Sequence, residues 1–266
     1  MQFLTTVLTS GRFDLLKKAL SSIPSGNDVH IICNTLDSDY RKQLDNSSLA
    51  RDYRIVHTES NGLAGAGQQS VLDHFLTTKY SHLIRLDGDD CFFEEGHQKI
   101  RFVMNNNPDI NVLTLIGEAI QTEAGKTSYR ADQIDLRRYV ESEFHNLTVE
   151  LAEWMFDLSG YTGDDEYWFE RLVCVDKKGA AIEKYDSLTC NCEDIQMHMK
   201  MRLLAHRGEI DYRQMFSTEC YLYNKFDGFG ASDAMLGDPK TWRQEVTGPF
   251  TEEELELINQ IKIPKV

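Results

Sequence analysis

Short apolar runs and helix-like apolar stripes alternate through the first half of the chain. The runs predict buried strands at 3–8, 29–33, 53–57, 82–86 and 112–116. Between them, apolar residues recur at spacings of three and four, which predicts helices at 15–23, 68–78 and 95–106. Such alternation is typical of an α/β protein with a mostly parallel sheet and helices on both faces.

The second half of the chain is less regular. Residues 130–170 are charged and aromatic without a clear period, which indicates an inserted or acceptor-side segment. Apolar runs at 171–175 and 181–185 flank a Lys-Lys-Gly sequence and predict a β-hairpin. Two further helices are predicted, at 192–206 and 251–261. No repeat and no Pro- or Ser-rich linker divides the chain, so a single domain over 1–266 is expected.

Composition and charge narrow the class of partners. The 266 residues are 41% hydrophobic and 27% charged, which is ordinary for a globular protein. Asp and Glu outnumber Lys and Arg by 43 to 28, which gives a net charge of −15. Because binding to nucleic acids and to anionic membranes relies on cationic side chains, both kinds of partner are disfavoured.

Nothing in the sequence indicates export or a membrane span. The residues before the first predicted strand contain no basic region or cleavage site. No apolar stretch approaches the roughly 18 residues that a membrane-spanning helix needs. The six cysteines include no CxxC pair. We therefore expect a reduced, cytoplasmic protein.

An acidic cluster follows the fourth predicted strand. Asp87, Asp89 and Asp90 come directly after the apolar run at 82–86. In open α/β sheets, ligands bind beyond the carboxyl ends of the strands. Like charges gathered there need a cation, and carboxylate oxygens suit Mg²⁺ or Mn²⁺ that is shared with substrate phosphates. The alternative is a solvated turn, since Asp and Gly are common turn residues.

Three segments of the chain resemble family 2 glycosyltransferases of the GT-A fold. Leu8 to Ile23 resembles the family's opening strand and helix, and Asn61 to Gln68 is similar to its Gly-rich turn. Leu83 to Asp90 closely matches the family's apolar strand that ends in an LDxDD signature. The resemblance covers roughly the first 120 residues and a later stretch. It implies an inverting, metal-dependent enzyme of Rossmann-like fold that transfers a sugar from a nucleotide-sugar donor to an acceptor hydroxyl.

The same resemblance implies roles on the donor side. Asp89 would lie near the donor ribose and, together with Asp90, hold Mn²⁺ or Mg²⁺, while Asp87 supports them from the strand end. The implied donor-binding residues are Thr9, Ser10, Arg12, Asn34, Asn61, Gly62, Gln68, Asp87, Asp89 and Lys225. Residues 1–120 would form the half that binds the nucleotide sugar, and residues 121–266 the half that binds the acceptor and carries the catalytic base.

The chain differs from the family at the positions that contact the nucleotide base in the family. Asn34 stands roughly where the family has an aspartate, and Gly67 and Gln68 stand where it has an arginine and an asparagine. The identity of the base is therefore left open. The acceptor is open too, since a glycan, a lipid-linked precursor or another hydroxyl compound would fit.

A second acidic pair, Glu193-Asp194, lies at the start of a predicted helix. Transfer with inversion needs one base that takes the proton of the attacking hydroxyl. The family carries an acidic pair at a comparable distance after its metal motif. The resemblance thus implies Asp194 as the base and Glu193 as a residue that contacts the acceptor or orients the site. The alternative is structural, because the helix macrodipole stabilises acidic residues in a first turn.

Other features are weaker candidates. The Gly-rich, aromatic stretch at 223–230 could order over the donor as a lid, with Lys225 near a phosphate. Four residues are more often ordinary core or surface residues, but have a functional alternative: His198 and His206 as metal ligands, and Trp154 and Trp168 as a platform for an acceptor sugar.

Two other functional classes are open. Asp87 and Asp89 after an apolar strand are also typical of haloacid-dehalogenase-like phosphatases, in which the first Asp is a nucleophile and the second an acid. Those enzymes place the motif on the first strand, whereas three predicted strands precede it here. The other class is a GT-A-like sugar-nucleotide-binding module that has lost activity, and the presence of both acidic clusters argues against it.

Overall fold

A seven-stranded sheet forms the centre of the molecule. A computed structural model of the chain describes residues 1–93, 95–116, 119–122, 127–129, 171–185, 193–216, 220–225, 247–258 and 260–266. In sheet order, the strands are β10 (Tyr212–Phe216), β6 (Val112–Ile116), β9 (Arg171–Asp176), β4 (His82–Asp87), β1 (Phe3–Thr9), β2 (Asp28–Cys33) and β3 (Arg54–His57). Strand β9 is antiparallel to both of its neighbours, and the other neighbouring pairs are parallel. The predicted α/β class with a mostly parallel sheet is confirmed.

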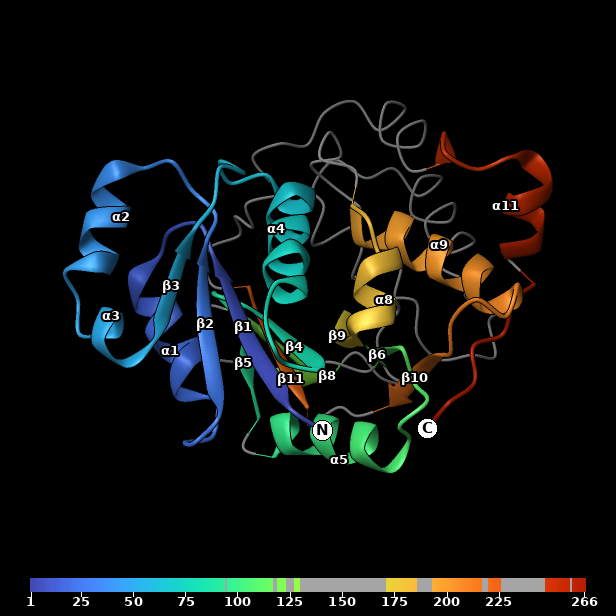
Figure 1. Cartoon of the computed structure of the whole chain (residues 1–266), viewed down its shortest axis with the longest axis horizontal. Coiled ribbons are helices and arrows are strands. Elements are labelled where there is room, and N and C mark those ends of the chain that lie inside the picture. The colour runs from blue at the N-terminus through green and yellow to red at the C-terminus, as the bar shows by residue number, and fades with distance from the viewer. Residues whose placement is uncertain are drawn as a thin grey trace.

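Helices cover both faces of this sheet (Figure 1). One face carries α1 (Phe13–Ser21), α2 (Ser38–Asp45), α3 (Leu49–Asp52) and α5 (Gly96–Asn106). The other face carries α4 (Ala64–Leu76), α8 (Lys177–Ile182) and α9 (Glu193–His206), and α11 (Glu252–Ile258) packs against α9. Each set of helices shares an apolar core cluster with the sheet. Because both faces of the sheet are covered, the central strands are continuous apolar runs in the sequence. None of the helices in the described ranges is long and apolar enough to cross a membrane.

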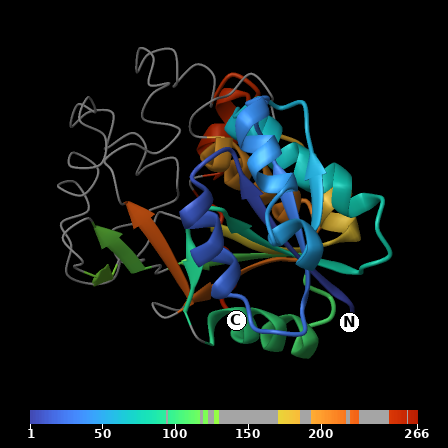
Figure 2. The same ribbon diagram turned by 90° about the vertical axis from the view of Figure 1, so that its left-hand side faces the viewer.

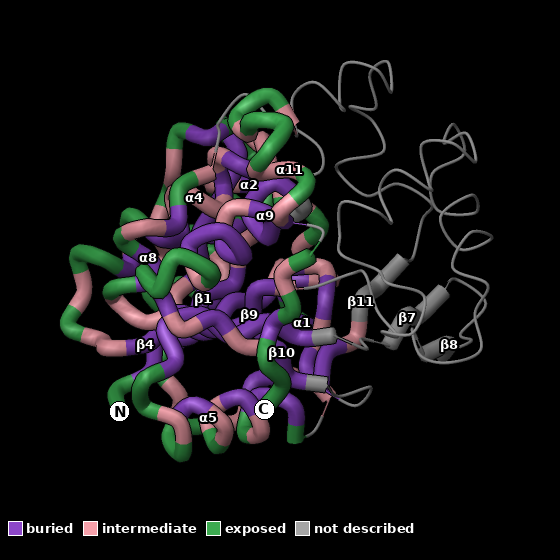
Figure 3. The backbone as a smooth tube through the Cα atoms, turned by 90° about the vertical axis from the view of Figure 1, so that its right-hand side faces the viewer, coloured by how far each residue is buried: buried purple, intermediate pink, exposed green. Residues whose placement is uncertain are grey.

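Strand β4 divides its side chains between the two cores. Ile84 and Leu86 belong to the cluster under α1 and α5, whereas Leu83 belongs to the cluster under α4 and α9. Because side chains alternate along a strand, Arg85 and Asp87 lie on the same face as Leu83. The backbone of the sheet is buried throughout its centre (Figure 3). Strand β4 therefore presents two charged side chains to the face that α4, α8 and α9 cover.

A second, four-stranded sheet begins directly after the acidic cluster. Its order is β5 (Cys91–Phe92), β11 (Tyr221–Lys225), β7 (Ala119–Thr122) and β8 (Thr127–Tyr129). Strand β11 is antiparallel to β5 and places Tyr221 opposite Phe92. The strands β7, β8 and β11 lie to one side of the main body (Figure 2). Asp90 thus stands where the chain passes from β4 of the large sheet to β5 of the small one.

The hairpin predicted at 171–185 is wrong. Strand β9 is present, but Lys177–Ile182 is the helix α8. Asp176 caps this helix, because its Oδ1 accepts a hydrogen bond from the Gly179 backbone N–H at 2.7 Å. Gly179 permits close packing rather than a turn, since a Cβ there would lie 2.6 Å from the Asn111 carbonyl oxygen. The hairpin prediction overlooked Asp176, which can cap a helix that begins directly after the strand.

Several other elements were not predicted. The sequence pattern gave no indication of α2, α3, β5, β7, β8, β10 or β11. Residues 223–225, predicted to begin a flexible lid, instead lie in strand β11, and residues 226–230 lie outside the described ranges. The irregular segment 130–170, with Trp154 and Trp168, also lies outside them. The helices and strands that were predicted in the first half, by contrast, begin and end close to the predicted residues.

Candidate active site

The carboxyl ends of β1 and β4 meet through very close backbone packing. The Gly88 N–H donates to the Leu8 carbonyl oxygen at 2.7 Å. A Cβ at position 88 would lie 2.7 Å from that oxygen and 3.0 Å from Cβ of Thr9, so only glycine fits there. Thr9 is itself held by its Oγ1, which is 2.6 Å from the Tyr40 hydroxyl. The acidic cluster is thereby tied to the carboxyl end of β1.

Asn34 and Gly67 pack directly against each other at the end of β2. The Asn34 Nδ2 donates to the Leu63 carbonyl oxygen at 3.1 Å, which ties β2 to the start of α4. A Cβ at position 67 would lie only 2.2 Å from Nδ2 of Asn34. The loop before α4 turns through Asn61 at φ 51 and Gly62 at φ 80, both in the left-handed region. Two of the three departures from the family pattern, at 34 and 67, therefore form a single packing unit.

The Asp87 carboxylate, at the tip of β4, is held from two sides. Its Oδ1 accepts from the Gln68 Nε2 of α4 at 3.2 Å. Its Oδ2 accepts from Nη1 of Arg171, the first residue of β9, at 2.7 Å. Strand β9 is antiparallel to β4, so the first residue of β9 lies near the last residues of β4. Arg171 is therefore placed beside Asp87. Both oxygens of Asp87 thus have partners within the protein.

Asp90 is fully buried and is held by the small sheet. Its Oδ2 accepts from the Tyr221 hydroxyl at 2.7 Å, and Nη1 of Arg171 lies 3.7 Å from the same oxygen. The Tyr221 hydroxyl also accepts from the Asp87 backbone N–H at 3.3 Å. The Arg171 guanidinium stacks over the Tyr221 ring at 4.6 Å from its centre. Tyr221 and Arg171 therefore connect both sheets to the acidic cluster.

The start of α9 lies within electrostatic reach of this cluster. Burial raises the pKa of Glu193 to about 8, with further upward contributions from Asp194 and Asp87, while Arg171 lowers it. Burial and then Asp87 likewise raise the pKa of Asp89, against the opposing effect of Arg12 and Arg171. Asp194 itself is exposed, in the first turn of the helix. The fold thus brings together the two acidic motifs that the sequence singled out, residues 87–90 and 193–194.

Most of the predicted donor residues surround the same strand ends. Thr9 is the last residue of β1, and Ser10 and Arg12 lie between β1 and α1. Asn34 follows β2, Asn61 and Gly62 precede α4, and Gln68 lies on α4. Arg12 adopts φ 55, an uncommon conformation for a residue other than glycine, and its charge acts on Asp89. Lys225 is the last residue of β11. Ser10 is exposed.

The two histidines of α9 do not join the cluster. His198 is buried in the core, where its Nδ1 lies 2.8 Å from the Tyr212 hydroxyl. His206 is the last residue of α9 and is exposed, at the opposite end of the helix from Glu193. His198 is thus a core residue, and His206 is a surface residue.

Arg171 and Tyr221 are site residues that the sequence reasoning missed. They lie 84 residues after Asp87 and 131 residues after Asp90, respectively. In the sequence, Arg171 is only the polar first residue of an apolar run, and Tyr221 precedes the stretch read as a lid. A cationic side chain at the carboxyl edge of the sheet, next to three aspartates, is the signal that could have found Arg171. To recognise this signal, one would have to know that β9 lies beside β4, which the sequence does not show.

The acidic cluster fits a hard divalent cation in its chemistry. All its donors are carboxylate oxygens, and burial, followed by neighbouring carboxylates, raises the pKa values of Asp89 and Glu193, so a bound cation would favour their charged forms. Within the described residues, no three carboxylate, imidazole or thiolate groups form a complete protein-only metal site. Mg²⁺ sites with one or two carboxylates, completed by substrate phosphates, are common. The residues present therefore fit a metal that arrives with a phosphorylated ligand.

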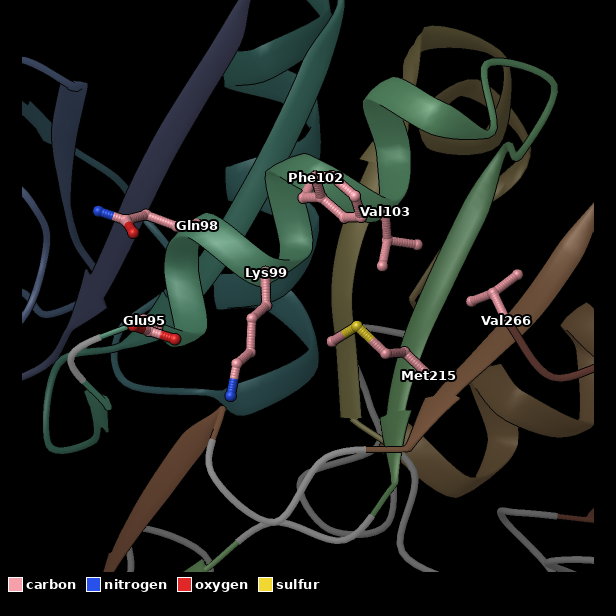
Figure 4. A pocket seen from close by; sticks show the side chains of 7 residues that line it. All are labelled: Glu95, Gln98, Lys99, Phe102, Val103, Met215 and Val266. Carbon is pink, nitrogen blue, oxygen red and sulfur yellow. The ribbon is translucent and has the colours of Figure 1, made fainter.

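An open pocket of about 540 Å³ lies outside this cluster, between α5 and β10 (Figure 4). Apolar side chains, among them Phe102, Val103 and Met215, make up much of its lining, together with Glu95 and Lys99. None of its lining residues belongs to the acidic cluster, so we assign it no part in the chemistry of the site.

The sequence matches no protein-family model, and no curated protein matches it with significant similarity. Solved structures do match. The structure of S. aureus TarS 1-349 in complex with UDP-GlcNAc has a TM-score of 0.61 and 14% identity, over 97% of this chain and 70% of that chain. The fold is GT-A-like.

Two further TarS structures agree with this assignment. The complex of TarS 1-349 with UDP has a TM-score of 0.54 and 12% identity, over 97% of this chain and 70% of that chain. A longer TarS structure has a TM-score of 0.53 and 13% identity, over 84% of this chain. This chain spans only 37% of the length of that longer protein. At these identities, the likeness to TarS concerns the fold.

Proposed function

We propose that the chain is an inverting, metal-dependent glycosyltransferase that moves a sugar from a nucleotide-sugar donor to an acceptor hydroxyl by single displacement. The observation that carries the proposal is the meeting of two acidic motifs at one edge of a GT-A-like sheet, where Asp87 acts on Glu193 at the start of α9. A protein of the same fold, TarS, binds UDP-GlcNAc and UDP.

The donor would lie over the carboxyl ends of β1, β2 and β4. Thr9, Ser10, Arg12 and Asn34 border this region on one side, and the loop before α4 with Gln68 on the other. Asp89 and Asp90 would hold Mn²⁺ or Mg²⁺, which when bound supplies charge neutralisation for the leaving diphosphate. Arg12 and Arg171 add fixed positive charge beside the same carboxylates.

The acceptor would approach from the side of α9. Asp194 takes the proton of the acceptor hydroxyl as the acceptor oxygen forms its bond to the anomeric carbon, and the bond from that carbon to the diphosphate oxygen breaks. Asp194 is suited to this role because it is exposed in the first turn of α9. Glu193, whose pKa is raised to about 8, is mainly protonated at neutral pH and can donate a hydrogen bond that orients the site.

The charge of the chain limits the acceptor class. With a net charge of −15, the surface disfavours polyanions such as nucleic acids. A glycan, a lipid-linked precursor or another hydroxyl compound is the acceptor that we propose. Asn34 and Gly67, which pack together, would help to determine which base binds.

Asp194→Asn is the sharpest test of the mechanism. We expect transfer to fall by at least about 10²-fold, because a general base contributes that much or more. Binding of UDP with Mn²⁺, measured by calorimetry, should stay near wild type. Asp89→Asn should instead abolish Mn²⁺-assisted binding of UDP. Asp109→Asn, an exposed aspartate elsewhere on the surface, is the matched control.

Three outcomes would contradict the proposal in whole or in part. Near-wild-type transfer by Asp194→Asn would refute the base assignment. Hydrolysis of a generic phosphomonoester would favour the phosphatase. Binding of nucleotide sugars without any hydrolysis or transfer, across a panel of acceptors, would favour the binding module.

A further inference from the structure

Arg171 occupies the middle of the acidic cluster. Its Nη1 donates to Oδ2 of Asp87 at 2.7 Å and lies 3.7 Å from Oδ2 of Asp90. Its charge also lowers the pKa of Glu193, which belongs to a separate element, α9. One guanidinium therefore acts on carboxylates from β4, from the loop after β4 and from α9.

Packing holds this guanidinium in place. It stacks over the ring of Tyr221, which is buried, at 4.6 Å from the ring centre. The Tyr221 hydroxyl lies between the Asp87 backbone N–H and the Asp90 carboxylate, which it meets at 3.3 and 2.7 Å. The side chain of Arg171 remains 24% exposed, so it is accessible to a ligand. Arg171 and Asp87 belong to the seven-stranded sheet and Tyr221 to the four-stranded sheet, so both sheets hold the guanidinium in place.

A metal ion and Arg171 compete for the same negative charge. The guanidinium satisfies Asp87 directly and lies beside Asp90, one of the proposed metal ligands. A divalent cation that enters alone would lie close to this fixed positive charge and be repelled by it. A nucleoside diphosphate brings further negative charge, which compensates both cations at once. Metal binding should then be coupled to nucleotide binding.

We propose that Arg171 is a positioning residue that orients Asp87 and Asp90 and keeps metal affinity low until a nucleoside diphosphate binds. The proposal rests on the proposed function, because it assumes that the cluster holds a metal beside a diphosphate. Its physical content is independent of catalysis: the guanidinium is a positive charge held inside the acidic cluster. Removing its charge should make the cluster a better site for the metal alone.

The test is binding of Mn²⁺ alone and with UDP, measured from the free Mn²⁺ signal in electron paramagnetic resonance. In the wild type, we expect UDP to tighten Mn²⁺ binding by at least about tenfold, a coupling of ordinary size for linked sites. Arg171→Met should bind Mn²⁺ alone at least about tenfold more tightly than the wild type, because the repulsion is gone. Arg171→Lys keeps the charge and should resemble the wild type. Arg207→Gln, which changes a surface arginine paired with Glu254, is the control.

Equal Mn²⁺ affinity of the wild type and Arg171→Met without UDP would overturn the inference and leave the proposed function intact. If Arg171→Met does not fold, the wild type still decides, since Mn²⁺ binding that is equally tight with and without UDP also overturns it. Absence of Mn²⁺ binding under all conditions would instead refute the metal-dependent function, and the inference with it.

Discussion

Strand β4 contributes to two arginine–carboxylate pairs that differ in almost every respect except their face of the sheet. Arg85 donates from its Nη1 to Oε1 of Glu183 at 2.8 Å, and two residues later Asp87 accepts from Arg171 at 2.7 Å. The side chains of the first pair are 7% and 0% exposed, whereas those of the second are 24% and 31% exposed. One pair is sealed under α4 and α8, and the other is open at the strand end.

The sealed pair is a structural group of neutral total charge. Arg85 Nη1 also donates to the Tyr185 hydroxyl at 3.0 Å, and the Tyr185 backbone N–H donates to the Gln69 side chain on α4 at 2.9 Å. Glu183 and Tyr185 lie after α8 in the chain that leads toward α9. Arg85 thereby ties this stretch to the strand that ends in Asp87.

The open pair belongs to a cluster of several carboxylates. Asp87 and Asp90 share Arg171, while the pKa values of Asp89 and Glu193 are raised. A buried pair without ligand access can only stabilise or destabilise the fold, whereas a partly exposed cluster of carboxylates can bind a cation. The comparison predicts that the same substitution, arginine to methionine, changes stability at one position and ligand binding at the other.

The largest effect on stability is expected for Arg85→Met. This change leaves the Glu183 carboxylate buried without its cation, and loss of one member of a buried pair typically costs about 3–5 kcal/mol. Urea unfolding should show the loss as a lower midpoint. Replacing both partners, as in Arg85→Met with Glu183→Met, should restore most of the stability because no charge is then buried. An Arg85→Met protein as stable as the wild type would mean that the pair is not sealed.

A smaller effect is expected for Arg171→Met in the same measurement. The pair is partly exposed and solvent screens it, so we expect a loss of about 1 kcal/mol in the free energy of unfolding. Arg207→Gln at the surface should leave the unfolding midpoint unchanged. If Arg171→Met were as destabilising as Arg85→Met, the cluster at the strand end would be a structural pair like the other, and the contrast drawn between them would fail.

A third expected effect depends on pH and concerns Glu193. Its pKa is about 8 in the folded protein against an ordinary value of 4.5, so folding favours the protonated form. The free energy of unfolding should therefore fall as pH rises from about 4.5 to about 8, the interval between these two pKa values. Glu193→Gln removes this contribution, so the variant should gain at least about 1 kcal/mol relative to the wild type between pH 5 and pH 8.

The pH series needs its own control. Glu209→Gln, an exposed glutamate just after α9, should follow the wild type at each pH. A Glu193→Gln variant whose stability parallels the wild type from pH 5 to pH 8 would show that burial, Asp194 and Asp87 do not raise the pKa of Glu193.

Much of the fold could be predicted because its signals are local. The apolar runs of β1, β2 and β4 are continuous because both faces of the sheet are covered, and α1 and α4 show apolar residues at helical spacing. The failures are also local in origin. Lys177, Lys178 and Gly179, directly after β9, fit either a turn or the first turn of a helix. Only the structure shows that Asp176 caps a helix by accepting a hydrogen bond from the Gly179 N–H.

The sequence by itself determined the α/β class, the acidic cluster at the tip of β4 and the acidic start of α9, because each depends on residues close together in the chain. Only the tertiary structure decided which charges compensate them. Arg171 and Tyr221 reach the cluster because β9 lies between β4 and β6 and β11 pairs with β5. Those pairings join residues 84 and 131 positions apart, and no local pattern encodes which distant strands become neighbours.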